Sequence, residues 1–225
     1  MTLKTEDIGA AILKGVCNPE AKDLVVDLGE FELAALLDED TLREVPIIKS
    51  IIACHKTWEA VHDRLFLRKV AMFLSSSPKF THEQKEKFIQ EHLHDLKEAK
   101  QLSDAIVLIL DKLDDFEKPQ MVAKAFAAFI RGEVGLETFR RLATAIGIGF
   151  LDDLKELARL DPAVSSVKEF FKLDPTVRSE LRELYFKLLR TGLTRIKSSS
   201  GTVPITGVGY EVTELGKSFI KCMNA

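Results

Sequence analysis

Residues 174–197 read DPTVRSELRELYFKLLRTGLTRIK, and this stretch decides how the C-terminal part of the chain folds. Asp174 and Pro175 are a capping residue and a first-turn proline, so a helix begins here, and Gly192 ends it. Apolar side chains recur on one face of that helix, at Val177, Leu181, Leu184, Tyr185 and Leu188. The segment 193–197 then alternates as a strand does.

The residues after this strand predict a hairpin and a closing helix. The segment 198–209, SSSGTVPITGVG, is rich in serine and glycine and is typical of a hairpin connection. Residues 210–212 return as a second strand, and Thr213 with Glu214 caps a final helix.

A second Asp-Pro pair lies upstream of the first. Asp161 and Pro162 start another helix thirteen residues before Asp174, which is the spacing of a helix-turn-helix. We therefore predict three small helices and one two-stranded β-hairpin within residues 161–225.

The order of these elements resembles the recognition helix, wing and closing helix of bacterial winged-helix regulators. In that superfamily a small residue and Gly-Leu follow the recognition helix, and a tyrosine strand leads through Leu/Val-Thr-Glu-x-Gly into the last helix. The matching positions are Gly192, Leu193, Tyr210, Val212, Thr213, Glu214 and Gly216. The resemblance covers about 50 residues and implies a winged-helix domain.

The resemblance also implies which residues contact DNA. A recognition helix lies in the major groove and offers its outward side chains to bases and phosphates, while the wing root reaches phosphates. The implied DNA contacts are Arg178, Ser179, Arg182 and Phe186 on the helix, with Arg195 and Lys197 on the strand. Two features depart from the pattern, because Glu180 and Glu183 lie on or near the same face and the wing tip, 198–209, has no basic residue.

These departures leave a second interpretation open, in which the arginines form surface pairs at i,i+4 spacing and the winged helix packs on another protein or on the bundle. The charge distribution fits both interpretations. Residues 162–225 carry 10 Lys and Arg against 6 Asp and Glu, or +4, whereas residues 1–161 carry 22 against 29, or −7. We expect a non-enzymatic interaction protein that contacts another protein or itself, in a bacterial regulatory or phage-defence setting, and the alternative is a DNA-binding transcriptional regulator.

The first 160 residues predict a bundle of seven or eight helices, so the fold class is mainly α, with domains at 1–160 and 161–225. The stretch 28–40 fits both a helix and a strand, and its run of alanine and leucine favours a helix. The segment 46–74 predicts one long helix or two nearly collinear ones, and a further helix begins at Thr81. The other predicted helices are 5–16, 105–113, 119–131, 136–146 and 151–160. Thr81 and Gln84 form a capping box, and Ser103 and Asp104 are placed to cap the helix at 105.

The composition excludes disordered and membrane-embedded proteins. Hydrophobic residues make up 46% and charged residues 30%, as in ordinary globular proteins. Three cysteines without a CxxC motif indicate free thiols in a reducing compartment. No export signal is expected at the N-terminus, and no apolar run approaches the roughly 20 residues that cross a bilayer. We expect a cytoplasmic protein with no membrane contact.

Motifs for catalysis, cofactors and metals are incomplete. The string GKS at residues 216–218 lacks the first glycine of a phosphate-binding loop, because position 211 is Glu211. Two Glu-x-x-His pairs, Glu59 with His62 and Glu91 with His94, supply half of a paired-metal site at most. We therefore expect no catalytic residues, no cofactor and no metal.

Overall fold

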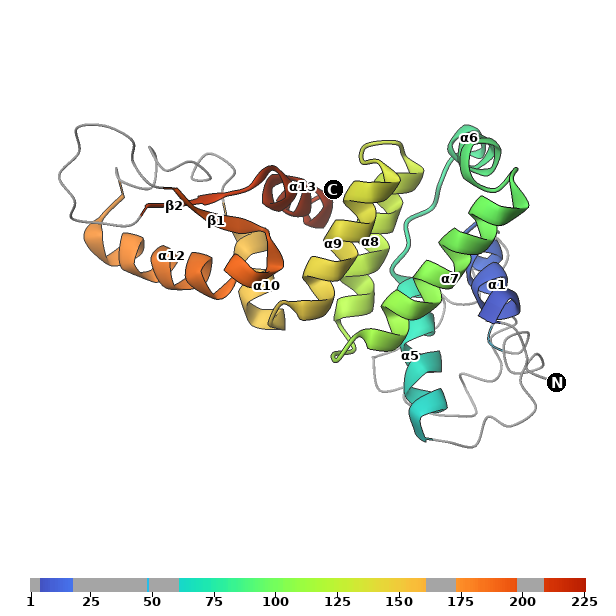
Figure 1. Cartoon of the computed structure of the whole chain (residues 1–225), viewed down its shortest axis with the longest axis horizontal. Coiled ribbons are helices and arrows are strands. Elements are labelled where there is room, and N and C mark those ends of the chain that lie inside the picture. The colour runs from blue at the N-terminus through green and yellow to red at the C-terminus, as the bar shows by residue number, and fades with distance from the viewer. Residues whose placement is uncertain (1–4, 18–47, 49–60, 161–172, 198–208) are drawn as a thin grey trace. The chain divides into compact units, whose positions relative to one another are not determined.

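A computed structural model of the chain describes residues 5–17, 48, 61–160, 173–197 and 209–225 (Figure 1). Within these residues the protein is mainly helical and has one two-stranded antiparallel sheet, as predicted. None of the described helices combines the length and apolar character needed to cross a bilayer. The contacts divide the chain into two compact units, Met1–Glu133 and Val134–Ala225.

The first unit contains five described helices. They are α1 (Thr5–Cys17), α5 (Val61–Ser75), α6 (His82–His92), α7 (Leu96–Lys112) and α8 (Lys118–Ile130). Helix α7 packs against α1, α5 and α6, and α8 packs against α5 and α6. Phenylalanines fill the core between α5, α6 and α8, where the rings of Phe73, Phe88, Phe126 and Phe129 meet at centroid distances of 5.5 to 5.9 Å. The predicted interior position of Phe126 and Phe129 is confirmed.

One predicted cap of this unit is confirmed and the other is wrong, because Ser103 and Asp104 lie inside α7 and not at its start. The capping box of Thr81 and Gln84 opens α6. The next helix was expected from residue 105, whereas α7 begins at Leu96. The reason is Asp95, whose carboxylate accepts hydrogen bonds from the amides of Lys97 and Glu98 and so provides the helix start nine residues earlier.

A cluster of charges joins α5, α7 and α8. The side chain of Lys118 is 2% exposed, and its Nζ lies 2.5 Å from Oδ1 of Asp114. The Nζ of Lys69 donates to the carbonyl of Asp111 at the end of α7, at 2.9 Å. The hydrogen bond from Lys118 is the main reason that the pKa of Asp114 lies below its usual value, and burial lowers the pKa of Lys69. Asp114 thus pairs with a buried lysine where the chain passes from α7 into α8.

The second unit contains α9 (Leu136–Ile148), α10 (Leu151–Arg159), α12 (Pro175–Lys187), the short 3-10 helix η3 (Leu189–Thr191), β1 (Thr194–Lys197), β2 (Gly209–Val212) and α13 (Glu214–Met223). Helix α12 packs against β1, β2 and α10, while α13 packs against α9, α10 and β2. Helices α9 and α10 were predicted as part of the bundle of residues 1–160. In the structure they lie in the same unit as the hairpin. The helix expected from Asp161 lies outside the described residues.

Three threonine hydroxyls make hydrogen bonds at the junctions between the helices and the strands of this unit. Thr191 Oγ1 donates to the carbonyl of Leu188, and Thr194 Oγ1 donates to the carbonyl of Tyr185 at 2.7 Å. Thr213 caps α13 as predicted, since its Oγ1 accepts from the amide of Gly216. The backbone has no room for a larger residue at Gly216, where a Cβ atom would lie 2.1 Å from the Leu193 carbonyl oxygen. This close approach seats α13 on the start of the hairpin.

Candidate interaction surface on α12 and β1

Helix α12 has one face in the core and one in solvent. Its buried side chains are Leu181, Leu184 and Tyr185, followed by Leu188 at the C-cap. At 100° per residue, Ser179, Arg182 and Phe186 lie on the opposite side, and all three are exposed. Phe186 is 62% exposed at the middle of that side. We call these three residues, their exposed neighbours Glu183 and Lys187, and the exposed Arg190 of the following helix η3 the outward face of α12.

Arg178 takes part in the start of the helix. The Asp174 carboxylate caps α12 by accepting from the amide of Thr176 at 2.8 Å. The Arg178 side chain is half-buried, and its Nη2 donates to the carbonyl of Leu173 at 2.8 Å. The structure therefore places the guanidinium of this predicted DNA contact against the backbone just before the helix.

An ion pair at i,i+4 spacing crosses the outward face. Nζ of Lys187 lies 2.8 Å from a carboxylate oxygen of Glu183 and 4.0 Å from Oδ1 of Asp153 on α10. The hydrogen bond from Lys187 lowers the pKa of Glu183, and the same hydrogen bond raises the pKa of Lys187. The negative charge of Glu183 is therefore matched locally by a lysine.

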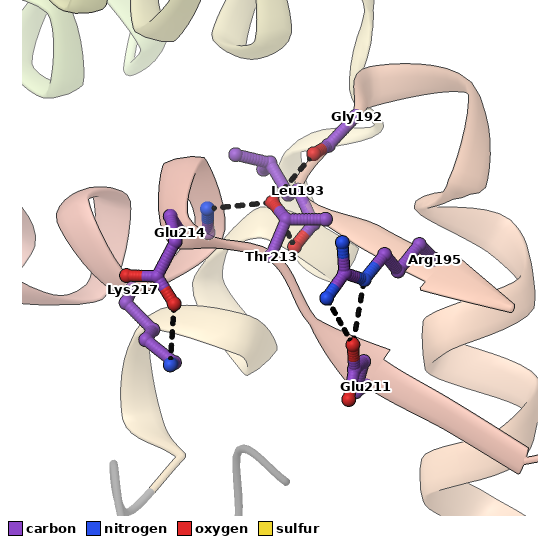
Figure 2. Close-up of polar contacts among 8 residues, drawn as sticks. Gly192, Leu193, Arg195, Glu211, Thr213, Glu214 and Lys217 are labelled. Atoms are coloured by element: carbon purple, nitrogen blue, oxygen red, sulfur yellow. Dashed lines mark hydrogen bonds and ion pairs between the residues drawn. The ribbon is translucent and has the colours of Figure 1, made fainter. Parts of the chain in front are cut away.

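At the root of the hairpin, Arg195 faces a carboxylate on the other strand. The register pairs Arg195 with Glu211 and Lys197 with Gly209. Nε and Nη2 of Arg195 both approach one oxygen of Glu211, with Nε at 2.6 Å (Figure 2). The Arg195 side chain remains 62% exposed, whereas that of Glu211 is 8% exposed. A phosphate would have to compete with Glu211 for this guanidinium.

Polar contacts link the start of the hairpin to the closing helix α13 (Figure 2). The hydroxyl of Thr213 lies 2.7 Å from the carbonyl oxygen of Gly192 and 3.1 Å from that of Leu193. One turn into α13, Lys217 pairs with Glu214 at 2.6 Å. Gly192 itself has a φ of 75°, a left-handed conformation that suits glycine and turns the chain from η3 into β1.

Sequence reasoning missed an apolar corner between α9 and α10. Ile148 and Phe150 are 61% and 67% exposed, and Phe150 is the N-cap residue of α10. A large apolar N-cap is unusual, because it offers no oxygen to the helix amides. That mismatch between residue type and position is the one signal in the sequence that could have identified the corner.

Metal-ligating side chains are scattered in the part of the chain that the structure describes. Among the described ranges, no group of three or more His, Cys, Asp and Glu side chains is placed to hold a metal ion. Glu59 lies outside those ranges. Glu91 and His94, the second Glu-x-x-His pair, are both exposed on or just after α6. The neighbouring ring of His92 contacts that of Phe129, with centroids 4.6 Å apart and planes tilted by 46°.

Comparison with family models, with curated proteins and with solved structures gives no match to this chain. The interpretation of the surface on α12 and β1 therefore rests on its own geometry and charges.

Proposed function

We propose that the C-terminal unit is a non-enzymatic protein-binding module and that the outward face of α12 is its contact surface. The observation that carries the proposal is Phe186, an aromatic side chain exposed at the centre of that face. Burying apolar area drives most protein association, and aromatic residues with arginines around them dominate the energy of protein interfaces. Arg182, one helical turn before Phe186, and Arg190, four residues after it on η3, are both exposed.

The polar contacts of the unit favour a protein over DNA as the occupant of this face. Arg178 donates to the Leu173 carbonyl, and Arg195 is held by Glu211. Glu180 and Glu183 are exposed on α12, and carboxylates there repel phosphates. The electrostatic attraction on which DNA affinity depends is reduced by both effects.

Site-specific photo-crosslinking tests the proposal. A photoreactive phenylalanine analogue replaces Phe186 in the full chain, and the irradiated partner is identified by mass spectrometry. We expect a discrete protein adduct that excess unmodified chain suppresses and excess Phe186→Ala chain does not. The matched control carries the analogue at Leu96, an exposed residue of α7, and should give no such adduct. Equal suppression by both competitors would contradict the assignment of this face.

DNA binding is the second candidate. This candidate rests on the resemblance of the sequence to winged-helix regulators and on Ser179 and Arg182, two of the implied DNA contacts, which are exposed on α12. Titration of duplex DNA at increasing salt distinguishes the two functions. DNA recognition requires affinity that falls log-linearly with salt, and Arg182→Ala should reduce that slope by about one. No binding at about 50 mM salt removes this candidate.

A further inference from the structure

Helix α6 is attached to the first unit by a narrow apolar contact. Of its 11 residues, only Phe88 is buried. The ring of Phe88 lies against the rings of Phe126 and Phe129 on α8, with centroid distances of 5.9 and 5.5 Å. His92 in the last turn adds a ring contact to Phe129 and is itself partly exposed. The neighbouring Ile89 is 43% exposed, so it provides no second anchor of the same quality.

The polar side-chain contacts of α6 stay within the helix and its cap. The capping box that opens the helix is local. Further along, His82 lies 3.3 Å from Glu86, and Lys87 lies 4.0 Å from Glu91. Within the described part of the chain, no hydrogen bond or ion pair joins a side chain of α6 to α7 or α8. Release of α6 from the unit therefore breaks ring contacts and leaves its polar contacts intact.

The chain is fixed on both sides of α6. Before the helix, the buried hydroxyl of Ser77 donates to the carbonyl of Phe73 at 2.9 Å, and Phe80 is buried. After the helix, the carboxylate of Asp95 caps α7 by accepting from the amide of Lys97 at 2.7 Å. The segment between Phe80 and Asp95 can thus move while its neighbours stay attached to the unit.

Helix α8, on which α6 lies, is anchored far more extensively. Ten of its 13 residues are buried, against the single residue of α6. Burial of one phenylalanine favours the attached state by a factor of about ten to a hundred and fifty. The global stability of a domain corresponds to a factor of several thousand or more, on the order of 10⁴. Segments with few buried apolar contacts open at lower cost than the whole fold, so α6 opens far more often than α8 unfolds.

We propose that α6 is a flap that moves away from α8 as a unit, ahead of global unfolding, and uncovers the rings of Phe126 and Phe129. This device belongs to the first unit and does not depend on the protein-binding function proposed for α12. An isolated helix of this length is marginal in water, so the released α6 loses its helical hydrogen bonds and exposes its amides to solvent.

Hydrogen exchange of the full chain, measured by mass spectrometry at several urea concentrations below global unfolding, tests the flap. We expect the amides of α6 to exchange as a group, at least about a hundredfold faster than those of α8 and with a weaker dependence on urea. Phe88→Leu should speed exchange in α6 about tenfold, because it weakens the one buried contact that closes the flap.

The matched control is Phe66→Leu, which alters a buried phenylalanine of α5. It should speed exchange in α8 and leave exchange in α6 unchanged, since Phe66 stays packed when only α6 opens. Equal rates and equal urea dependence in α6 and α8 of the wild type would show that α6 opens only with the whole unit. Fast exchange in α6 that ignores Phe88→Leu would show fraying of the helix in place, which also overturns the flap.

Discussion

Arg195 lies directly opposite Glu211 in the antiparallel sheet, and one carboxylate oxygen of Glu211 accepts from both Nε and Nη2 of the guanidinium. The acceptor is almost fully buried, while the donor is mostly exposed. Arg195 therefore donates hydrogen bonds to a carboxylate that the fold has removed from water. The winged-helix resemblance implies a phosphate contact for the same arginine.

Arg195→Ala should destabilise the second unit through this pair. A buried charged acceptor that loses a hydrogen-bonding partner costs about 1–3 kcal/mol, and urea unfolding measures the change. The matched control is Arg141→Ala, since Arg141 pairs with Glu137 at 2.7 Å but both side chains are well exposed. That variant should change the free energy of unfolding by less than about 1 kcal/mol. Equal effects in the two variants would mean that burial of Glu211 does not matter.

Gly216→Ala should be more harmful than helix propensity predicts. Alanine is about 1 kcal/mol better than glycine inside a helix, yet a Cβ here would lie 2.1 Å from the Leu193 carbonyl oxygen and 2.5 Å from Cγ1 of Val212. Helix α13 must move away from the hairpin, so we expect a net loss of about 1–3 kcal/mol in thermal or urea unfolding. Gly135→Ala is the control, because no atom lies within 4 Å of its Cβ position. A Gly216→Ala protein as stable as the Gly135→Ala protein would contradict the predicted clash.

Local signals in the sequence predicted the elements whose ends are fixed by their own residues. Thr81, Asp174 and Thr213 cap the helices that follow them, because each needs only amides two or three residues away. Gly132 ends α8 with a φ of 72° for the same local reason. The strands were predicted within one residue, since alternation and turn residues are local patterns too.

Features that depend on tertiary contacts could not be predicted in this way. The cross-strand register decides that Arg195 meets Glu211, and the sequence offers no independent evidence for that register. Whether α9 and α10 belong with the bundle or with the hairpin depends on which apolar faces meet, and an apolar stripe along one helix does not say which other element covers it. The half-buried position of Arg178 follows from the path of the chain before α12. Two of the implied DNA contacts, Arg178 and Arg195, thus make intramolecular hydrogen bonds that local sequence patterns do not reveal.

The pair of Asp114 and Lys118 should make stability depend on pH in the acid range. The hydrogen bond from Lys118 lowers the pKa of Asp114 in the folded protein, so the folded state takes up this proton less readily than the unfolded state. The stabilisation is fully present above the ordinary carboxyl pKa of about 4 and is lost as the pH falls through the folded value. Because the Asp114 side chain is 72% exposed, solvent screening limits the effect to about 1 kcal/mol or less.

A double-mutant cycle isolates this contribution. The difference in unfolding free energy between wild type and Asp114→Asn should be largest near pH 7 and shrink towards about pH 3. In a Lys118→Met background, Asp114→Asn should have no pH-dependent effect of this kind. A difference that persists unchanged to low pH would show that the pair does not act through the charge of Asp114.

Tyr185 should make the folding stability decrease as the pH rises in the alkaline range. Burial raises the pKa of its phenol to about 12, whereas an unfolded tyrosine ionises near about 10. The contribution to stability is complete below the unfolded pKa and is lost as the pH rises through the folded value. Ultraviolet titration of the wild type should show a phenol component near 12 that Tyr185→Phe lacks. The same variant should lose less stability between pH 9 and 11, on the order of one pKa unit of linkage.

Phe186 and Leu184 lie two residues apart on α12, and truncation to alanine should destabilise the fold at Leu184 but not at Phe186. Leu184 is buried in the core of the unit, so Leu184→Ala should cost about 2–5 kcal/mol of unfolding free energy. Phe186 is exposed, so Phe186→Ala should stay within about 0.5 kcal/mol of wild type and keep the helical circular dichroism spectrum. A large loss for Phe186→Ala would place the ring in the fold and not at an interface. A neutral change means that the folded protein gains little from an exposed aromatic ring, which is the condition under which a binding role best explains its presence.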